Sequence, residues 1–160
     1  MTARVRALAL ATPTEGGSMT TTRHAHTQWN GSLMEGSGTV TFQSSGLGTF
    51  PVTWAARSAE PAGLTSPEEL IAAAHSTCFS MALSNGLAKA GTPPMSLETS
   101  AEVDFTPGVG ITGIRLAVTG RVPGLDAAGF QAAAEQAKVN CPVSKALAAV
   151  DITLKVTFVD

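Results

Sequence analysis

The stretch SPEELIAAAHSTCFSMALSNGLAKAG, residues 66–91, decides the fold of this chain. It opens with Ser66 as a candidate N-cap, a proline suited to the first helical position, and Glu69 to complete a capping box. Residues 71–88 contain no Asp, Glu, Lys or Arg, and Gly91 with two nearby prolines ends the helix. Because a helix uncharged all round is buried on most sides, we expect a central helix covered by other elements or by a second subunit.

Composition narrows the class of protein. The chain has 160 residues, which suits one domain, and a formal net charge of −2 with no basic cluster, so we expect no nucleic acid partner. A membrane-spanning helix needs about 20 mainly apolar residues. Residues 71–88 hold one histidine, three serines, one threonine and one asparagine, so we expect no membrane span. Two cysteines are too few for a secreted disulfide framework, and we expect a cytoplasmic protein.

Strand patterns lie on both sides of the central helix. Within residues 24–58, three stretches rich in Thr, Val, Phe and Trp are separated by glycines, which predicts three strands, the last ending at Arg57. Residues 95–106 and 110–122 predict an antiparallel pair, and the alternation over 152–158 predicts a final strand with one covered face.

Two more helices are predicted before the final strand. Asp126 can cap a helix to about Val139, and Cys141 with Pro142 begins a shorter one through Ala149. The whole order is α+β without an internal repeat. We expect residues 1–18 to be a poorly ordered extension and residues 19–160 to form a single domain.

The two cysteines, Cys78 and Cys141, lie 63 positions apart and form no CxxC motif. They are either unrelated buried thiols or a pair that meets in the fold, and both options stay open at this point. Burial raises the pKa of a thiol, so a nucleophilic Cys78 would need a cation from another segment. Cys141 lies at or next to an N-cap, where the helix dipole favours a thiolate, so local physics makes Cys141 the more acidic thiol.

The candidate cation is Arg57, the conspicuous charge on a mostly apolar strand, although a solvated strand end is the plain alternative. Glu68 has only a generic first-turn role and is free to hold an arginine. A metal site competes with this interpretation. His75 and Cys78 share a helix face, and Cys141 with His24 or His26 could complete a set, but the spacing fits no zinc-finger pattern.

Two motifs carry a resemblance to a known family. SPEELIAAAHSTCFSMALS, residues 66–84, resembles the cysteine helix of the osmotically inducible protein C (OsmC) family, and NCPVSKAL, residues 140–147, resembles its second cysteine motif. The resemblance covers about residues 24–160. The organic hydroperoxide resistance (Ohr) proteins are close relatives, and His75 with the FSMAL run after Cys78 looks more like the OsmC branch.

The resemblance implies an OsmC-like fold, with antiparallel sheets wrapped around central helices in an interwoven homodimer and active sites at the interface. It implies that Cys78 attacks a hydroperoxide and that Cys141 resolves the sulfenate to a disulfide. Arg57 matches the arginine that activates the attacking thiol, and Glu68 matches the acid that positions that arginine. We follow the family over local physics on which thiol attacks, because a guanidinium in a low-dielectric pocket outweighs a helix end.

These inferences predict a cysteine-based peroxidase that reduces small organic hydroperoxides to alcohols without a metal or organic cofactor. A dithiol, for which a lipoyl-type dithiol is one candidate, would recycle it. The alternatives are a redox-sensing or stress-response binding module that uses the same disulfide without turnover, and a structural stress protein with inert thiols.

Two geometric expectations concern the central helix. We expect Phe79, Met81 and Leu83 to form an apolar pocket wall that favours organic hydroperoxides. Ten residues of straight helix put Glu68 and Cys78 about 15 Å apart along the axis. Either the helix breaks between them or Glu68 reaches across from the other subunit.

Overall fold

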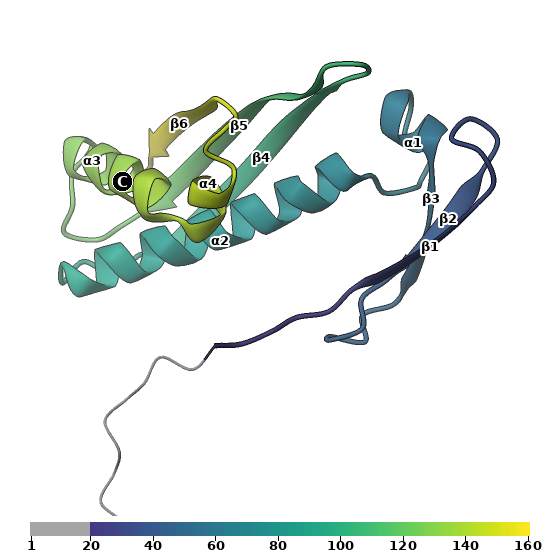
Figure 1. The fold of residues 1–160 in the computed structure, drawn as a ribbon. Helices are drawn as coiled ribbons and strands as arrows, with labels where there is room; N and C mark the ends of the chain where they lie inside the picture. The colour runs from purple at the N-terminus through teal and green to yellow at the C-terminus, as the bar shows by residue number, and fades with distance from the viewer. Residues whose placement is uncertain (1–19) are drawn as a thin grey trace, which may run out of the picture.

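The computed structural model describes residues 20–160, so the extension expected over residues 1–18 lies outside the described residues. The described chain has two parts, each built on a β-sheet, and helices pack on only one of the two sheets (Figure 1). An N-terminal sheet stands beside a larger body in which helices cover one face of a second sheet.

The N-terminal sheet contains β1 (His26–Asn30), β2 (Ser37–Thr41) and β3 (Thr49–Thr53), paired antiparallel in the order β1-β2-β3. All residues of β1 are exposed, and Val40 is the one buried residue of the three strands. A three-stranded sheet needs a covered apolar face for independent stability. Within the described chain this sheet does not have one.

Helix α1 (Trp54–Ser58) corrects the expectation that the third strand runs on to Arg57. The hydroxyl of Thr53 accepts a hydrogen bond from the Ala56 N–H at 3.1 Å and so caps a short helix at the end of β3. Val52 and Trp54 favour strands, so the sequence around Thr53 does not indicate that a helix begins there. Arg57 therefore projects from a helical turn.

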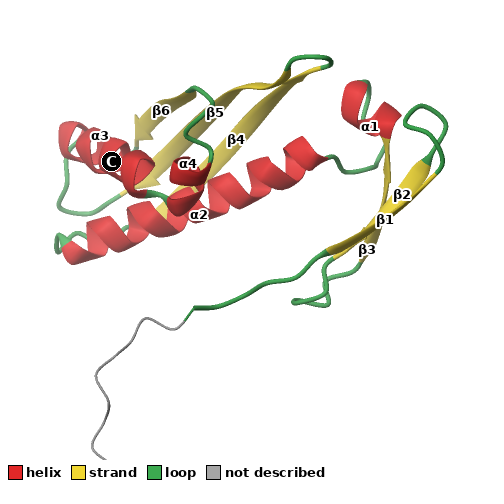
Figure 2. Cartoon of the chain, viewed as in Figure 1, coloured by secondary structure: helices red, strands yellow, loops and turns green. Residues whose placement is uncertain are grey.

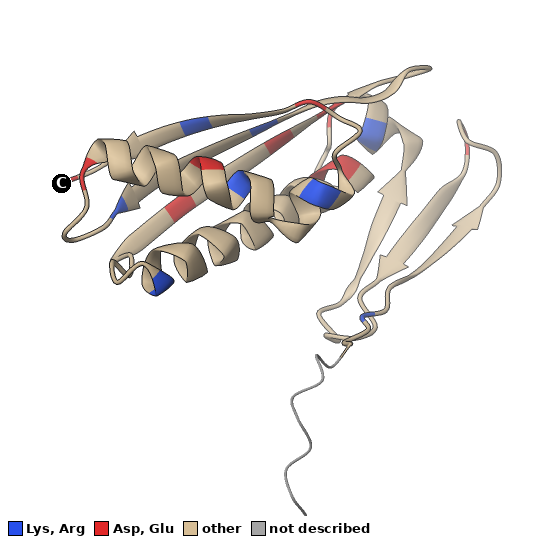
Figure 3. Cartoon of the chain, turned by 60° about the vertical axis from the view of Figure 1, so that its left-hand side comes forward, with Lys and Arg blue, Asp and Glu red and all other residues tan. Residues whose placement is uncertain are grey.

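Helix α2 (Pro67–Lys89) is continuous, with Ser66 as the N-cap accepting from the Glu69 N–H at 3.2 Å, as predicted. Its buried residues repeat every four or seven positions along one face and are Glu68, His75, Phe79, Leu83 and Leu87. The opposite face is exposed within this chain and carries no charge between its ends (Figure 3). The expected burial on most sides is therefore not supplied by one chain.

The second sheet contains β4 (Ser96–Thr106), β5 (Gly110–Arg121) and β6 (Ile152–Phe158) in the order β4-β5-β6. The antiparallel β4–β5 pair is as predicted. β6 pairs parallel to β5, so the sheet is mixed rather than antiparallel. The reason is the connection, which crosses from β5 back to the start of β6 through two helices, as a parallel pair requires.

These helices are α3 (Ala127–Asn140) and α4 (Pro142–Ala146), and α4 ends before the expected Ala149. They lie with α2 on the same face of the second sheet (Figure 2). The core packs tightly here, since a Cβ on Gly120 of β5 would stand 2.1 Å from the Phe130 ring of α3. Among residues 20–160, none of the helices has the length and apolar character to cross a membrane.

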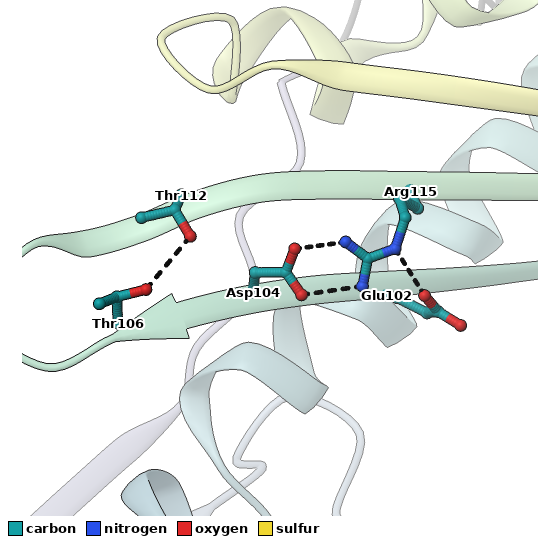
Figure 4. A network of polar contacts seen from close by, with 5 residues as sticks. All are labelled: Glu102, Asp104, Thr106, Thr112 and Arg115. Atoms are coloured by element: carbon teal, nitrogen blue, oxygen red, sulfur yellow. Dashed lines mark hydrogen bonds and ion pairs between the residues drawn. The ribbon is translucent and has the colours of Figure 1, made fainter.

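The uncovered face of the second sheet carries an exposed ion cluster (Figure 4). Arg115 on β5 donates to Glu102 and Asp104 on β4. The hydrogen bond from Arg115 is the main cause that lowers the pKa of Asp104. The cluster ties β4 to β5 at the surface.

Candidate active site

The two cysteines meet where α4 packs on the middle of α2. Cys78 lies on α2 and is partly exposed, whereas Cys141 lies between α3 and α4 and is fully buried in the core cluster. Both are free thiols, and they are close enough for a hydrogen bond between them to affect the pKa of each. A nucleophile and a potential disulfide partner are thus in place within one chain.

The pKa of Cys141 is lowered, although burial by itself acts to raise it. The backbone N–H of Ser144, the thiol of Cys78, the hydroxyl of Ser144 and the backbone N–H of Val143 all stabilise its thiolate. Cys141 is the N-cap of α4, as predicted from the Cys141-Pro142 pair. Within one chain, Cys141 is therefore the more acidic thiol, as local physics led us to expect.

The pKa of Cys78 is raised, first by burial and then by its contact with Cys141. The N–H of Val143 opposes this increase only in part. Arg57 is not among the groups that affect the Cys78 thiol. Among residues 20–160 of one chain, no cation thus acts on the expected attacking thiol.

Arg57 and Glu68 form the second polar cluster, between α1 and the first turn of α2. The Arg57 Nε donates to both Glu68 carboxylate oxygens at 3.1 and 3.2 Å, and Nη2 donates to Oε1 at 2.8 Å. Glu68 is nearly buried, and the guanidinium carbon lies 4.1 Å from the centroid of the Phe105 ring and 5.9 Å from that of Trp54. A fork of this kind fixes the guanidinium plane.

The structure does not bring the two clusters together within one chain. Because α2 is unbroken from Pro67 to Lys89, Glu68 and Cys78 are about 15 Å apart along its axis. The option of a broken helix is therefore wrong. The other option is also changed, since Glu68 binds the Arg57 of its own chain. The Arg57–Glu68 pair would have to reach a thiol as a unit.

Sequence reasoning missed Ser144 and gave His75 no catalytic role. His75 Nε2 lies 2.8 Å from Ser144 Oγ, and both residues are buried. Ser144 stands three positions after Cys141 in the second cysteine motif, a spacing that places its side chain near the N-cap. In the chain that the structure describes, no three His, Cys, Asp or Glu side chains gather as metal ligands would.

Two adjacent free thiols, one partly exposed and one fully buried, define a cysteine-based redox site. Similarity to known proteins identifies the family to which such a site belongs. The OsmC-like protein family matches residues 60–155. The chain is 42% identical over 139 residues to "Peroxiredoxin OsmC" of Escherichia coli K12, covering 85% of this chain and 96% of that protein.

Solved structures agree on the fold. An OsmC-like protein from Mycoplasma pneumoniae matches with a TM-score of 0.68 at 14% identity, covering 89% of this chain and 100% of that one. The organic hydroperoxide resistance protein OhrB of Bacillus subtilis matches with a TM-score of 0.58 at 24% identity, covering 84% and 98%. The chain therefore belongs to the OsmC-like family, and with its paired thiols it is a cysteine-based peroxidase. The expected α+β, OsmC-like fold is confirmed.

Proposed function

We propose that this peroxidase reduces organic hydroperoxides to alcohols through a Cys78 sulfenate and a Cys78–Cys141 disulfide. The Cys78 thiolate attacks the terminal peroxide oxygen, the O–O bond breaks, and the leaving alkoxide takes a proton to become the alcohol. The Cys141 thiolate then attacks the sulfenic sulfur, an S–S bond forms, and hydroxide leaves as water. A dithiol supplies two electrons and two protons to restore both thiols.

The observation that carries this proposal is the contact between the two thiols across α2 and α4. A sulfenate on Cys78 would form beside a thiol whose pKa is already lowered, which favours the thiolate that closes the disulfide. Cys78 is the more exposed of the two and is the one that a peroxide can reach. Exposure thus supports Cys78 as the attacking thiol.

The missing cation is proposed to come from a second copy of the chain. Arg57 with Glu68 forms a rigid, half-buried pair too far along α2 to reach its own Cys78. In a homodimer with interwoven subunits, the pair of one chain would face Cys78 of the other. A guanidinium near the sulfur would favour the thiolate by several kcal/mol even at an intermediate dielectric, which reverses the acidity order seen in one chain.

Uncovered apolar surface supports the homodimer. Several large apolar side chains are exposed on and around the N-terminal sheet, namely Trp29, Leu33, Met34, Leu47 and Phe50. The uncharged outer face of α2 is exposed too. Exposed apolar surfaces of this kind mark interaction sites. A second copy of the chain would bury both the apolar side chains of the N-terminal sheet and the outer face of α2.

The wall predicted from Phe79, Met81 and Leu83 is only partly available to a substrate. Phe79 and Leu83 are fully buried in the core, so the expectation that these two line a substrate pocket is wrong, whereas Met81 is exposed on the outer face of α2. The half-buried rings of Trp54 and Phe105, 5.9 Å apart and beside Arg57, provide apolar surface at the proposed thiolate activator. They would contact the carbon chain of an organic hydroperoxide. A cytoplasmic site is proposed because a cycling disulfide needs a reducing dithiol pool.

Mixed dimers test the proposal directly. Cys78→Ser chains, inactive alone, and Arg57→Ala chains, strongly impaired alone, are unfolded together, refolded and assayed with cumene hydroperoxide and a dithiol. A site built across two chains recovers about a quarter of the wild-type rate, because half the dimers regain one of two sites. No recovery in dimers shown to be mixed would contradict the shared site. Consumption that stops after one equivalent in the wild type would instead favour the redox sensor.

A further inference from the structure

His75 is a buried titratable group that the proposed cycle does not use. It is 0% exposed, and burial lowers the pKa of its imidazole, which keeps the ring neutral. Its Nε2 contacts the buried Ser144 hydroxyl at 2.8 Å. Its Nδ1 is, for residues 20–160, the buried side-chain nitrogen or oxygen that lacks a hydrogen-bond partner. A histidine buried in the core with a single hydrogen-bond partner, Ser144, requires a physical explanation.

Two contacts between α2 and α4 run side by side. His75 and Cys78 are three residues apart on one face of α2. Cys141 is the N-cap of α4 and Ser144 is its third helical residue, the position whose side chain turns back toward an N-cap. His75 on α2 contacts Ser144 on α4, and Cys78 on α2 contacts Cys141 at the start of α4. The Ser144 hydroxyl thus contacts the imidazole from the helical position that faces the N-cap residue Cys141.

Proton counting fixes the direction of this chain. A serine hydroxyl has one proton to donate, and a Ser144 hydroxyl that helps to lower the pKa of Cys141 would donate that proton toward the sulfur. Its oxygen would then accept from His75 Nε2–H, at the 2.8 Å contact between them. This requires the neutral tautomer with a bare Nδ1, which matches the nitrogen that has no partner. In this tautomer Nδ1 is an acceptor without a donor. The other tautomer would instead bury an N–H without an acceptor at the same place.

We propose that His75 is a positioning residue for Cys141, holding the Ser144 hydroxyl as a hydrogen-bond donor to the sulfur that closes the disulfide. This inference rests on the proposed function, because it concerns only its second step. In that step the Cys141 thiolate displaces hydroxide from the Cys78 sulfenic acid. His75 acts before the attack, by keeping Cys141 in its anionic form. It takes no part in the attack on the peroxide.

Rapid-quench intact-mass measurements separate the two steps, with the sulfenate trapped by dimedone. In Ser144→Ala and His75→Leu, disulfide closure should slow by about tenfold, the effect of losing one hydrogen bond to a charged group, while sulfenate formation keeps its wild-type rate. Ser144→Thr keeps the hydroxyl and should restore closure. Ser80→Ala is the matched control, since Ser80 is a partly buried serine on α2 whose hydroxyl contacts the Ser76 carbonyl and the Thr99 hydroxyl instead.

Wild-type closure rates in folded Ser144→Ala protein would overturn the inference and leave the proposed function intact. Equal slowing of both steps would also overturn it, since that indicates a merely structural role. Should His75→Leu fail to fold, Ser144→Ala, which removes a single oxygen, decides the question. Absence of any disulfide in the wild type would instead be a failure of the proposed function, visible before any variant is compared.

Discussion

Two polar clusters on the same helix differ in what each lacks. At the start of α2, Glu68 holds Arg57 in a rigid fork beside two aromatic rings, whereas both cysteines lie further along, at the contact between α2 and α4. Ten residues further on, Cys78 meets Cys141, with two thiols and no cation among the groups that affect the attacking sulfur. Each cluster is a complete piece of local structure and an incomplete active site.

The difference explains why acidity within one chain is in the wrong order for the proposed cycle. The N–H groups at the start of α4 and the Ser144 hydroxyl favour the Cys141 thiolate, whereas the Val143 N–H alone favours that of Cys78 and does not offset its burial. An enzyme of this design would gain its attacking thiolate only on assembly. The peroxidase would then be inert as a single chain, which keeps a reactive thiolate from forming before the pocket is closed.

Removing either thiol gives the largest expected effect. Cys78→Ser should abolish peroxide reduction, because the attacking sulfur is gone. Cys141→Ser should react once and leave a Cys78 sulfenate, which has no thiol partner and which a second equivalent of peroxide would oxidise to the sulfinic acid. Intact mass after one equivalent of peroxide distinguishes the two variants. Oxidation appearing on Cys141 in the Cys78→Ser protein would exchange the two roles.

Breaking the ion pair should cost less than removing a thiol. Arg57→Ala is expected to lower kcat/KM by roughly a hundredfold, the scale seen when one charge-stabilising donor is lost. It should also raise the pKa of Cys78 above that of Cys141, the order found within one chain. Arg57→Lys should be impaired as well, because an ammonium cannot make the planar fork to Glu68.

The thiolate of each cysteine can be followed by NMR of isotopically labelled side chains across a pH titration. A pKa of Cys78 that does not change in Arg57→Ala would remove Arg57 from the activation step. A Cys78 pKa that returns only when wild-type chains are mixed in would support activation from the partner.

The aromatic wall should have a smaller and more selective effect. Phe105→Ala removes a ring 4.1 Å from the Arg57 guanidinium. We expect about a tenfold loss of kcat/KM for cumene hydroperoxide, the value of two or so buried methylenes, with little change for hydrogen peroxide. Equal losses for both substrates would show that Phe105 positions Arg57 and does not contact the substrate.

Sequence reasoning predicted more of the fold than of the site. The long helix and its Ser66 cap follow from local signals and are confirmed, as are the β4–β5 pair and the Asp126 cap of α3. Local signals fail at Trp54–Ser58, where strand formers conceal a capped turn. The parallel pairing of β6 is set by a long crossover, which no local pattern records.

The site was harder because its contacts join distant segments. Cys78 and Cys141 were named from motifs, but the sequence left open whether they meet. The 2.8 Å contact between His75 and Ser144 spans 69 positions, and nothing in either residue's neighbourhood announces it. Ser144 had one available signal, its place three residues after a candidate N-cap.

The smallest effect should come from the other arginine with carboxylate partners. Arg115 also makes a fork, to Asp104, but it lies on the exposed face of the second sheet (Figure 4). Surface ion pairs contribute little to stability because solvent and salt screen them. Arg115→Gln should therefore leave kcat/KM unchanged and shift the urea midpoint only slightly. This makes Arg115 the matched control for Arg57, with the same chemistry in a different place.

The slight shift has a predictable dependence on pH. The hydrogen bond from Arg115 lowers the pKa of Asp104 from its ordinary 3.8. Its contribution to stability is thus fully present above that ordinary pKa and is lost as the pH falls through the lowered pKa. Urea midpoints of wild type and Arg115→Gln should differ at neutral pH and converge in acid.

A loss of activity in Arg115→Gln as large as that in Arg57→Ala would mean that the exposed face of β4 and β5 also belongs to the site. The contrast between the two arginines would then fail.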